Sequence, residues 1–137
     1  MIWIVLATFL FYSLNITGFK VKNFILTESC IKQEPQDIPF WLIYAGSVVV
    51  FILEPNIGKW MLFGFFIIGT ITMFFTTVRY MIFPNEKKIK GYNQYFAKTH
   101  RIIKPSEKRL IPDTFHIFLL ILIPINLFVL IVYIIYM

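Results

Sequence analysis

The stretch VVVFILEPNIGKWMLFGFF, residues Val48 to Phe66, places two apolar runs on either side of one short polar break. The break, Glu54 to Lys59, contains a proline and a glycine, residues that end a helix and let the chain reverse direction. The apolar flanks continue to Ile38 on one side and to Phe83 on the other. The pattern therefore predicts a tight hairpin of two antiparallel apolar helices.

Two further apolar runs lie on either side of this hairpin in the chain. The four runs predict an all-α integral membrane protein with four transmembrane helices in two antiparallel hairpins. We place the membrane segments at 2–19, 38–53, 59–83 and 114–137, and the connections at 20–37, 54–58 and 84–113. A span needs roughly 20 residues, so 38–53 crosses only if the bilayer thins locally, and a re-entrant hairpin is the alternative.

The composition supports a single membrane domain over residues 1–137. Apolar residues make up 58% of the chain and charged residues 15%, and the mean hydropathy is +0.75. A soluble domain carries about 25% charged residues. No Lys or Arg precedes the first apolar run and no cleavage site of small residues stands out, so we expect a retained first helix rather than a signal peptide.

The basic residues predict the orientation of the helices. All but Lys59 of the 13 Lys and Arg residues fall in or next to the connections 20–37 and 84–113. Loops rich in Lys and Arg stay on the cytoplasmic side. We therefore expect these two connections in the cytoplasm and both termini outside, in the cytoplasmic (inner) membrane of a bacterium.

The stretch EKKIKGYNQYFAKTHRIIKP, Glu86 to Pro105, is the most basic part of the chain. Its apolar side has spacings of three and four, typical of an amphipathic helix, and consists of Ile89, Tyr92, Phe96, Thr99 and Ile103. Its basic side includes Lys87, Lys90, Lys98 and Arg101. We expect Asn85 to cap the start of this helix and Pro105 to end it.

Lipid, protein and nucleic acid are the three kinds of partner to compare for a basic amphipathic helix next to a membrane segment. In the first case Tyr92 and Phe96 enter the headgroup boundary while the lysines contact anionic lipid. In the second, the basic side docks on an acidic cytoplasmic protein or on another subunit of a membrane complex. Nucleic acid is disfavoured, because no second basic element or known binding module accompanies the aromatic residues.

Polar residues inside apolar segments are candidates for helix packing or for a pore. Those singled out here are Gly69, Thr72, Thr76, Arg79 and Asn126. The first four have the spacing of one helix face, and Asn126 is costly if it faces lipid. Arg79 is expected either to reach the interface or to form an ion pair with Asp113. Asp113 is also expected to cap the last membrane helix and to lie near His116.

The sequence contains no motif that points to catalysis. It has no GxSxG, HExxH, Walker loop or CxxC pattern. The lone Cys30 gives no disulfide or zinc site within one chain, and the two histidines lack ligand-rich neighbours. We therefore expect no enzyme, no catalytic residue, no metal and no cofactor.

Two functional classes remain. The first is a small multi-pass membrane subunit, expected to be a homo-oligomer or part of a membrane complex, that anchors or regulates partners through its basic cytoplasmic loop. The second is an oligomeric channel or a pore-forming membrane effector, for example of a bacterial conflict or defence system. A chain of 137 residues leaves little room for an internal conduit, so a pore requires several protomers around an axis.

Overall fold

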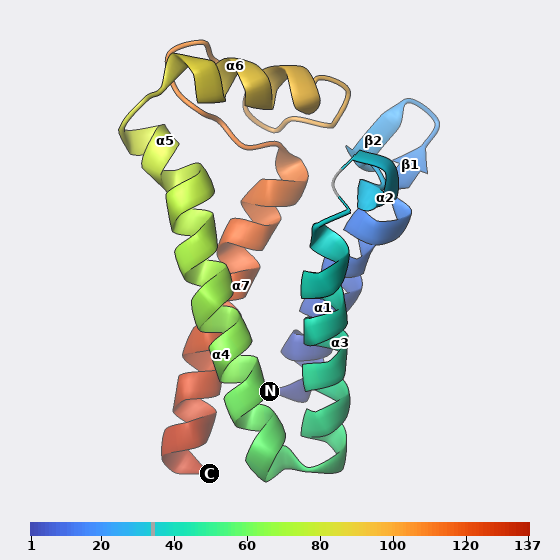
Figure 1. The fold of residues 1–137 in the computed structure, drawn as a ribbon, viewed down its shortest axis with the longest axis vertical. Helices are drawn as coiled ribbons and strands as arrows, with labels where there is room; N and C mark the ends of the chain where they lie inside the picture. Colours follow the sequence, from blue (N-terminus) through green and yellow to red (C-terminus); the bar gives the residue numbers. More distant parts are fainter. Residues whose placement is uncertain (34) are drawn as a thin grey trace.

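The computed structural model describes residues 1–33 and 35–137, without the side chains of Lys32 and Gln33 (Figure 1). The prediction that Lys32 adds positive charge to the connection 20–37 therefore concerns a side chain outside the described part of the chain. The elements are α1 (Ile2–Thr17), β1 (Phe19–Val21), β2 (Phe24–Thr27), α2 (Cys30–Gln33), α3 (Asp37–Leu53), α4 (Pro55–Met73), η1 (Phe74–Val78), α5 (Arg79–Ile82), α6 (Glu86–Tyr95) and α7 (Thr114–Tyr136). The chain is mostly helical, which confirms the all-α class.

The long apolar helical segments Ile2–Thr17, Asp37–Leu53, Pro55–Ile82 and Thr114–Tyr136 form the body of the molecule. The helix α6 lies across one end of it (Figure 1). The consecutive elements α4, η1 and α5 make one helical run, Pro55–Ile82, which like α7 is long and apolar enough to cross a membrane. The helices α1 and α3 are apolar but have only 16 and 17 residues. The predicted first segment was too long, because α1 ends before Gly18, whose positive φ of 75° leaves the helical region.

The turn between α3 and α4 is tighter than the predicted turn over 54–58. Glu54 alone separates the two helices, and α4 begins at Pro55. Proline suits the first helical position, because the N–H group that it lacks has no partner there. Gly58 is buried at the crossing, and a Cβ atom on it would lie 2.1 Å from the Cα atom of Phe51. A residue without a side chain is therefore required for this approach of the two backbones.

An antiparallel β-hairpin, which was not predicted, begins at the last residue of the predicted first segment and continues into the predicted connection 20–37. Strands β1 and β2 pair with Lys20 opposite Ile25 and Val21 opposite Phe24. Lys22 has a φ of 53°, which supplies the left-handed geometry that a two-residue hairpin turn needs. The alternation of apolar and basic residues from Phe19 to Lys22 was the available signal.

The interior joins the helices through both apolar and polar contacts. Tyr44 of α3 is buried, and its hydroxyl donates a hydrogen bond of 2.9 Å to the carbonyl of Val5 in α1. Asn126 of α7 donates from Nδ2 to Oγ1 of Thr8 in α1, at 2.6 Å. Because these contacts join distant parts of the chain, they fix the positions of α1, α3 and α7 relative to one another.

Candidate functional site

The helix α6 begins as predicted but ends much earlier. The side chain of Asn85 accepts a hydrogen bond from the backbone N–H of Lys88 at 3.1 Å, which confirms the expected cap. The helix stops at Tyr95, so the prediction that it continues to Pro105 is wrong. The residues that follow make contacts across the fold that a continuous helix would not allow, and these contacts replace the helical hydrogen bonds.

The apolar side of α6 packs on protein rather than remaining open to a lipid boundary. Ile89 is only 1% exposed. The hydroxyl oxygen of Tyr92 accepts a hydrogen bond of 3.2 Å from the backbone N–H of Asp113. The rings of Phe96 and His116 meet at 4.9 Å between centroids. The predicted insertion of Tyr92 and Phe96 into the headgroups is therefore corrected, because the start of α7 and the preceding loop occupy this side.

The basic side of the predicted helix is divided by the fold. Lys87, Lys90 and Lys98 are exposed, and Lys87 lies about 160° around α6 from the buried Ile89. Arg101 instead turns inward, toward the carbonyl of Ile111 and the ring of Tyr92. We call the exposed set Lys87, Lys90 and Lys98 the basic surface.

Arg101 holds the loop that follows α6. Its Nη1 donates to the carbonyl of Ile111 at 2.7 Å, and its Nη2 donates to the carbonyl of Phe96 at 3.5 Å. The guanidinium also lies 5.5 Å from the centroid of the Tyr92 ring, within the range of a cation–π interaction. Arg101 is therefore a clamp within the protein, and its predicted place on the outer basic side is wrong.

Asp113 is the centre of this arrangement and is only 1% exposed. Its Oδ1 lies 2.6 Å from Nδ1 of His116 and accepts the backbone N–H of the same residue at 3.1 Å. Its Oδ2 accepts a hydrogen bond of 2.8 Å from the hydroxyl of Thr99. This confirms the expected cap of α7. We call Asp113, His116, Thr99 and Tyr92 the aspartate anchor.

The predicted pair of Arg79 and Asp113 does not form in the part of the chain that the structure describes. Asp113 takes His116 as its ionic partner instead. Arg79 is exposed, and its guanidinium lies 5.9 Å from the centroid of the neighbouring Tyr80 ring. The physical reason is local, since the first turn of α7 brings His116 to its own capping carboxylate.

The anchor keeps the carboxylate ionised despite its burial. Burial alone would raise the pKa of Asp113, but the hydrogen bonds and charge of His116 and the Thr99 hydroxyl lower the pKa below its ordinary value. Burial raises the pKa of Tyr92, and the charge of Asp113 raises it further. The phenol therefore stays neutral.

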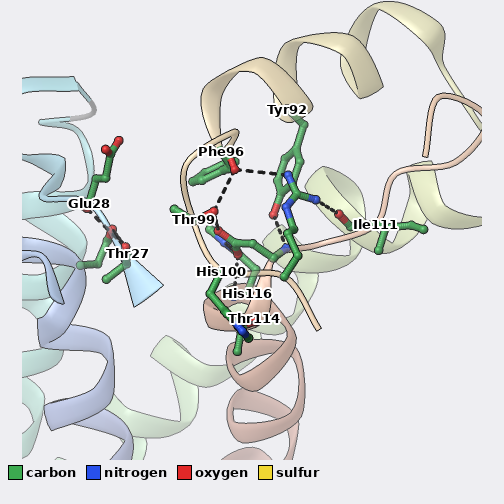
Figure 2. Close-up of polar contacts among 12 residues, drawn as sticks. Thr27, Glu28, Tyr92, Phe96, Thr99, His100, Ile111, Thr114 and His116 are labelled. Atoms are coloured by element: carbon green, nitrogen blue, oxygen red, sulfur yellow. Dashed lines mark hydrogen bonds and ion pairs between the residues drawn. The ribbon is translucent and has the colours of Figure 1, made fainter. Parts of the chain in front are cut away.

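A second set of contacts joins the loop after α6 to the β-hairpin. The backbone N–H of His100 donates to the carbonyl of Ile25 in β2 at 2.6 Å, and the carbonyl of His100 accepts from the backbone N–H of Thr114 at 3.0 Å. Nδ1 of His100 lies 2.8 Å from Oγ1 of Thr114. Figure 2 shows His100 between the hairpin and the start of α7. Sequence periodicity carries no signal for these contacts between distant segments.

A small polar cavity of about 20 Å³ lies beside the anchor, lined by residues that include Asn15, Glu28, Asp37 and His116. A space of this size holds one water molecule. Nδ2 of Asn15 donates to Oδ2 of Asp37 at 2.9 Å. Among the described residues, no group of three His, Cys, Asp or Glu side chains has the arrangement of a metal site.

The candidate pore residues do not share one surface. Gly69 faces α7, where a Cβ atom on it would meet Ile123 at an ordinary contact distance of 3.5 Å. Thr72 and Thr76 are exposed, and the Thr76 hydroxyl donates to the carbonyl of Thr72 at 2.8 Å. The π-helical turn η1 begins between these two threonines and changes the register that the spacing assumed.

Asn126 is buried in the interior of the bundle. Its Nδ2 donates to Thr8 and to the carbonyl of Leu122, while its Oδ1 has no partner among the described atoms. The side chain therefore joins α7 to α1 within one chain.

Comparison with known proteins gave no matching family model, no matching curated protein and no matching solved structure.

Proposed function

We propose that this chain is a four-span membrane protein that presents a rigid basic surface to an acidic cytoplasmic partner. The single observation that carries the proposal is the covered apolar side of α6. Because Ile89 is buried against protein, Lys87 and Lys90 are held at exposed positions of α6, and Lys98 is exposed in the turn that follows the helix. A preformed surface loses less conformational entropy on binding than a flexible loop does.

The apolar outer surface supports the membrane location. Large apolar side chains are exposed on every long helix, among them Leu10 on α1, Leu53 on α3, Ile68 on α4 and Phe128 on α7. A soluble monomer rarely exposes contiguous apolar surface of this extent. Lipid is the medium in which such an exterior is stable.

Four spans require that α1 and α3 also cross. At a rise of 1.5 Å per residue these helices are about 24 to 26 Å long, somewhat less than the hydrocarbon thickness of about 30 Å. Local thinning of the bilayer makes up a difference of this size at modest cost. The excess of Lys and Arg at the end that carries α6 favours the cytoplasm for that end.

A docking function is better supported than a pore. The polar Asn126 is used to join α7 to α1, and Gly69 packs toward α7. Of the predicted lining, Thr72, Thr76 and Arg79 remain exposed. The Thr76 hydroxyl already bonds to its own helix, and the Arg79 guanidinium lies near the ring of the neighbouring Tyr80. The basic surface, by contrast, has three exposed lysines, of which Lys87 and Lys90 lie on α6 and Lys98 lies in the turn that follows it.

Labelling of single cysteines tests the topology. We would introduce Lys98→Cys and Lys59→Cys separately, with the wild-type chain and its buried Cys30 as the labelling background. An impermeant maleimide should label position 98 only from the cytoplasmic side and position 59 only from the other side. Labelling of both positions from the same side would contradict the four-span arrangement.

A charge-reversal experiment tests docking. The full-length chain would be purified in nanodiscs with Lys87→Glu, Lys90→Glu and Lys98→Glu combined, next to a Lys59→Glu control at the opposite end. We expect a stoichiometric acidic partner to co-purify with the wild type and the control but not with the triple variant. If the wild type, the control and the triple variant recover the same amount of acidic partner, and the protein gives single-channel currents in planar bilayers, the pore is favoured instead.

A further inference from the structure

Two segments far apart in the sequence form one continuous edge next to α7. The hairpin strand β2 accepts the backbone N–H of His100 at the carbonyl of Ile25. The ring of Phe24 lies 4.7 Å from the imidazole of His100, centroid to centroid. The hairpin and the loop over 100–104 therefore stand side by side.

This edge exposes apolar side chains between basic ones. In the hairpin, Val21 is 54% exposed and its cross-strand neighbour Phe24 is 38% exposed. In the loop, Ile102 and Ile103 are 59% and 55% exposed. Lys20 and Lys22 flank Val21, and Lys104 follows Ile103. No Asp or Glu occurs in residues 17–27 or 96–106, so the edge has only positive formal charge.

The edge lies at the level where the apolar helices end. The first residue of α7, Thr114, donates its backbone N–H to the carbonyl of His100. Strand β1 begins at Phe19, directly after the end of α1 at Thr17. If α1 and α7 span the bilayer, the exposed side chains of this edge lie at its headgroup layer.

We infer that the hairpin tip and the loop over 100–104 together enter the headgroup layer of an anionic bilayer. The chemistry matches that layer, since apolar side chains reach the acyl boundary while neighbouring lysines contact lipid phosphate. The edge also continues the apolar exterior of α1 and α7, where Leu10 and Phe118 are exposed. The inference rests on the proposed membrane location and assigns lipid and protein to different surfaces: lipid to this edge, protein to the basic surface.

Environment-sensitive fluorophores on single cysteines test this assignment in the full chain. The two test positions are Val21→Cys and Ile103→Cys. Gln94→Cys on the outer side of α6 reports the aqueous environment, and Ile121→Cys, exposed on α7, reports the bilayer interior. The protein would be placed in nanodiscs of phosphatidylglycerol and phosphatidylcholine that carry nitroxides at either the shallow or the deep acyl position.

Shallow nitroxides should quench the labels at 21 and 103, and iodide should quench these labels about threefold less than the label at 94. Deep nitroxides should quench the label at 121. If the label at 121 is quenched while 103 remains as open to iodide as 94, the inference is overturned and the membrane location stands. If no lipid nitroxide quenches 121, the membrane location fails, and this inference fails with it.

The charge contribution is tested with matched variants. Replacing Lys20, Lys22 and Lys104 together by Gln should reduce the shallow quenching at position 103 in anionic nanodiscs to the level found in pure phosphatidylcholine. The control replaces Lys87, Lys88 and Lys90 by Gln, which removes the same charge from α6 and should leave that quenching unchanged. Equal effects of both variants, or shielding at 103 only after a purified acidic protein is added, would overturn the assignment to lipid.

Discussion

The two ends of the helical bundle connect their helices in opposite ways. At one end, a single residue joins α3 to α4, and Gly58 lets the two backbones approach to a distance that no side chain permits. At the other end, a long connection between α5 and α7 folds back on the bundle and is held by the aspartate anchor. Close contact between the backbones of α3 and α4 holds the first end, and buried polar contacts hold the second.

The two ends are therefore sensitive to different kinds of substitution. A close backbone contact has no tolerance for added volume, because interiors are packed near the density of organic crystals. A buried polar network tolerates small changes of shape but not the loss of a partner, because the remaining groups stay desolvated. The loss of stability caused by a substitution should therefore differ between the two ends, both in its size and in its dependence on pH.

The largest effect is expected from Gly58→Leu at the tight end. Its Cβ atom would overlap the backbone of Phe51, so α3 and α4 must separate, at a cost of about 3 kcal/mol or more. Thermal unfolding in detergent micelles measures the change. Gly64→Ala in the same helix is the control, because a Cβ atom there meets nothing within 4 Å. Equal stability of the two variants would contradict the steric account.

The next largest effect is expected from Asp113→Ala at the anchored end. The variant removes the cap of α7 and leaves Thr99 and His116 without their acceptor, at a cost of about 2 to 3 kcal/mol. Asp113→Asn can still cap the helix, so its loss should be about 1 kcal/mol. The rate of tryptic cleavage after Lys98 and Arg101 reports the release of the loop. A neutral Glu107→Ala control should leave this rate unchanged.

The anchor should also respond to acid. The pKa of Asp113 in the folded protein lies below its ordinary value of 3.8, so its stabilising contribution is complete above that pH and is lost as the pH falls through the lower folded-state pKa. Amide exchange over residues 89–99, corrected for intrinsic rates, should therefore accelerate below about pH 4. The same dependence should be absent in Asp113→Ala. Amides around Leu62 provide the internal reference.

A smaller loss of stability is expected from Arg101→Lys, which removes the guanidinium hydrogen bonds but keeps the positive charge. Lysine keeps the positive charge but cannot bond to Ile111 and Phe96 in the planar geometry of the guanidinium. We expect a loss of about 1 kcal/mol in loop stability, seen as faster amide exchange near Phe96. Lys98→Arg on the basic surface should have no such effect. Equal behaviour of both variants would mean that Arg101 acts only through its charge.

The smallest effect, and one of opposite sign, is expected from Gly91→Ala in α6. Nothing lies within 4 Å of the added Cβ atom, and alanine favours a helix interior by up to about 1 kcal/mol relative to glycine. The melting temperature should therefore rise slightly. Together with Gly58→Leu, this variant shows that the cost of a side chain at a glycine is set by its neighbours. A loss of stability on Gly91→Ala would show that α6 has contacts on its outer side.

Helix caps and helix ends depend on residues a few positions apart, and these could be predicted from the sequence. Asn85 and Asp113 were identified as caps because a cap involves residues three positions away. Glu54 and Pro55 marked the break between two apolar helices for the same reason. The hairpin was missed although Phe19 to Lys22 alternates in the expected way, because the run is short and follows an apolar helix directly.

The candidate site was predictable only in part. Lys87 and Lys90 are exposed at the helical positions that periodicity gave them. Arg101 shares their spacing but turns inward, because the helix ends at Tyr95 and the chain then follows its contacts to Asp113 and Ile25. Periodicity assumes that the helix continues and cannot indicate where tertiary contacts replace it.

Local patterns of residues were sufficient to predict the apolar helices, their approximate ends and the concentration of positive charge near one end of them. These follow from composition and from interactions within about one helical turn. Three features depend on the folded chain: other parts of the protein cover the apolar side of α6, Thr99 bonds to Asp113, and the hairpin lies beside the loop after α6. The physical reason is separation along the chain: the bond from Asn126 to Thr8 joins residues 118 positions apart, and no local pattern specifies which distant group will meet another.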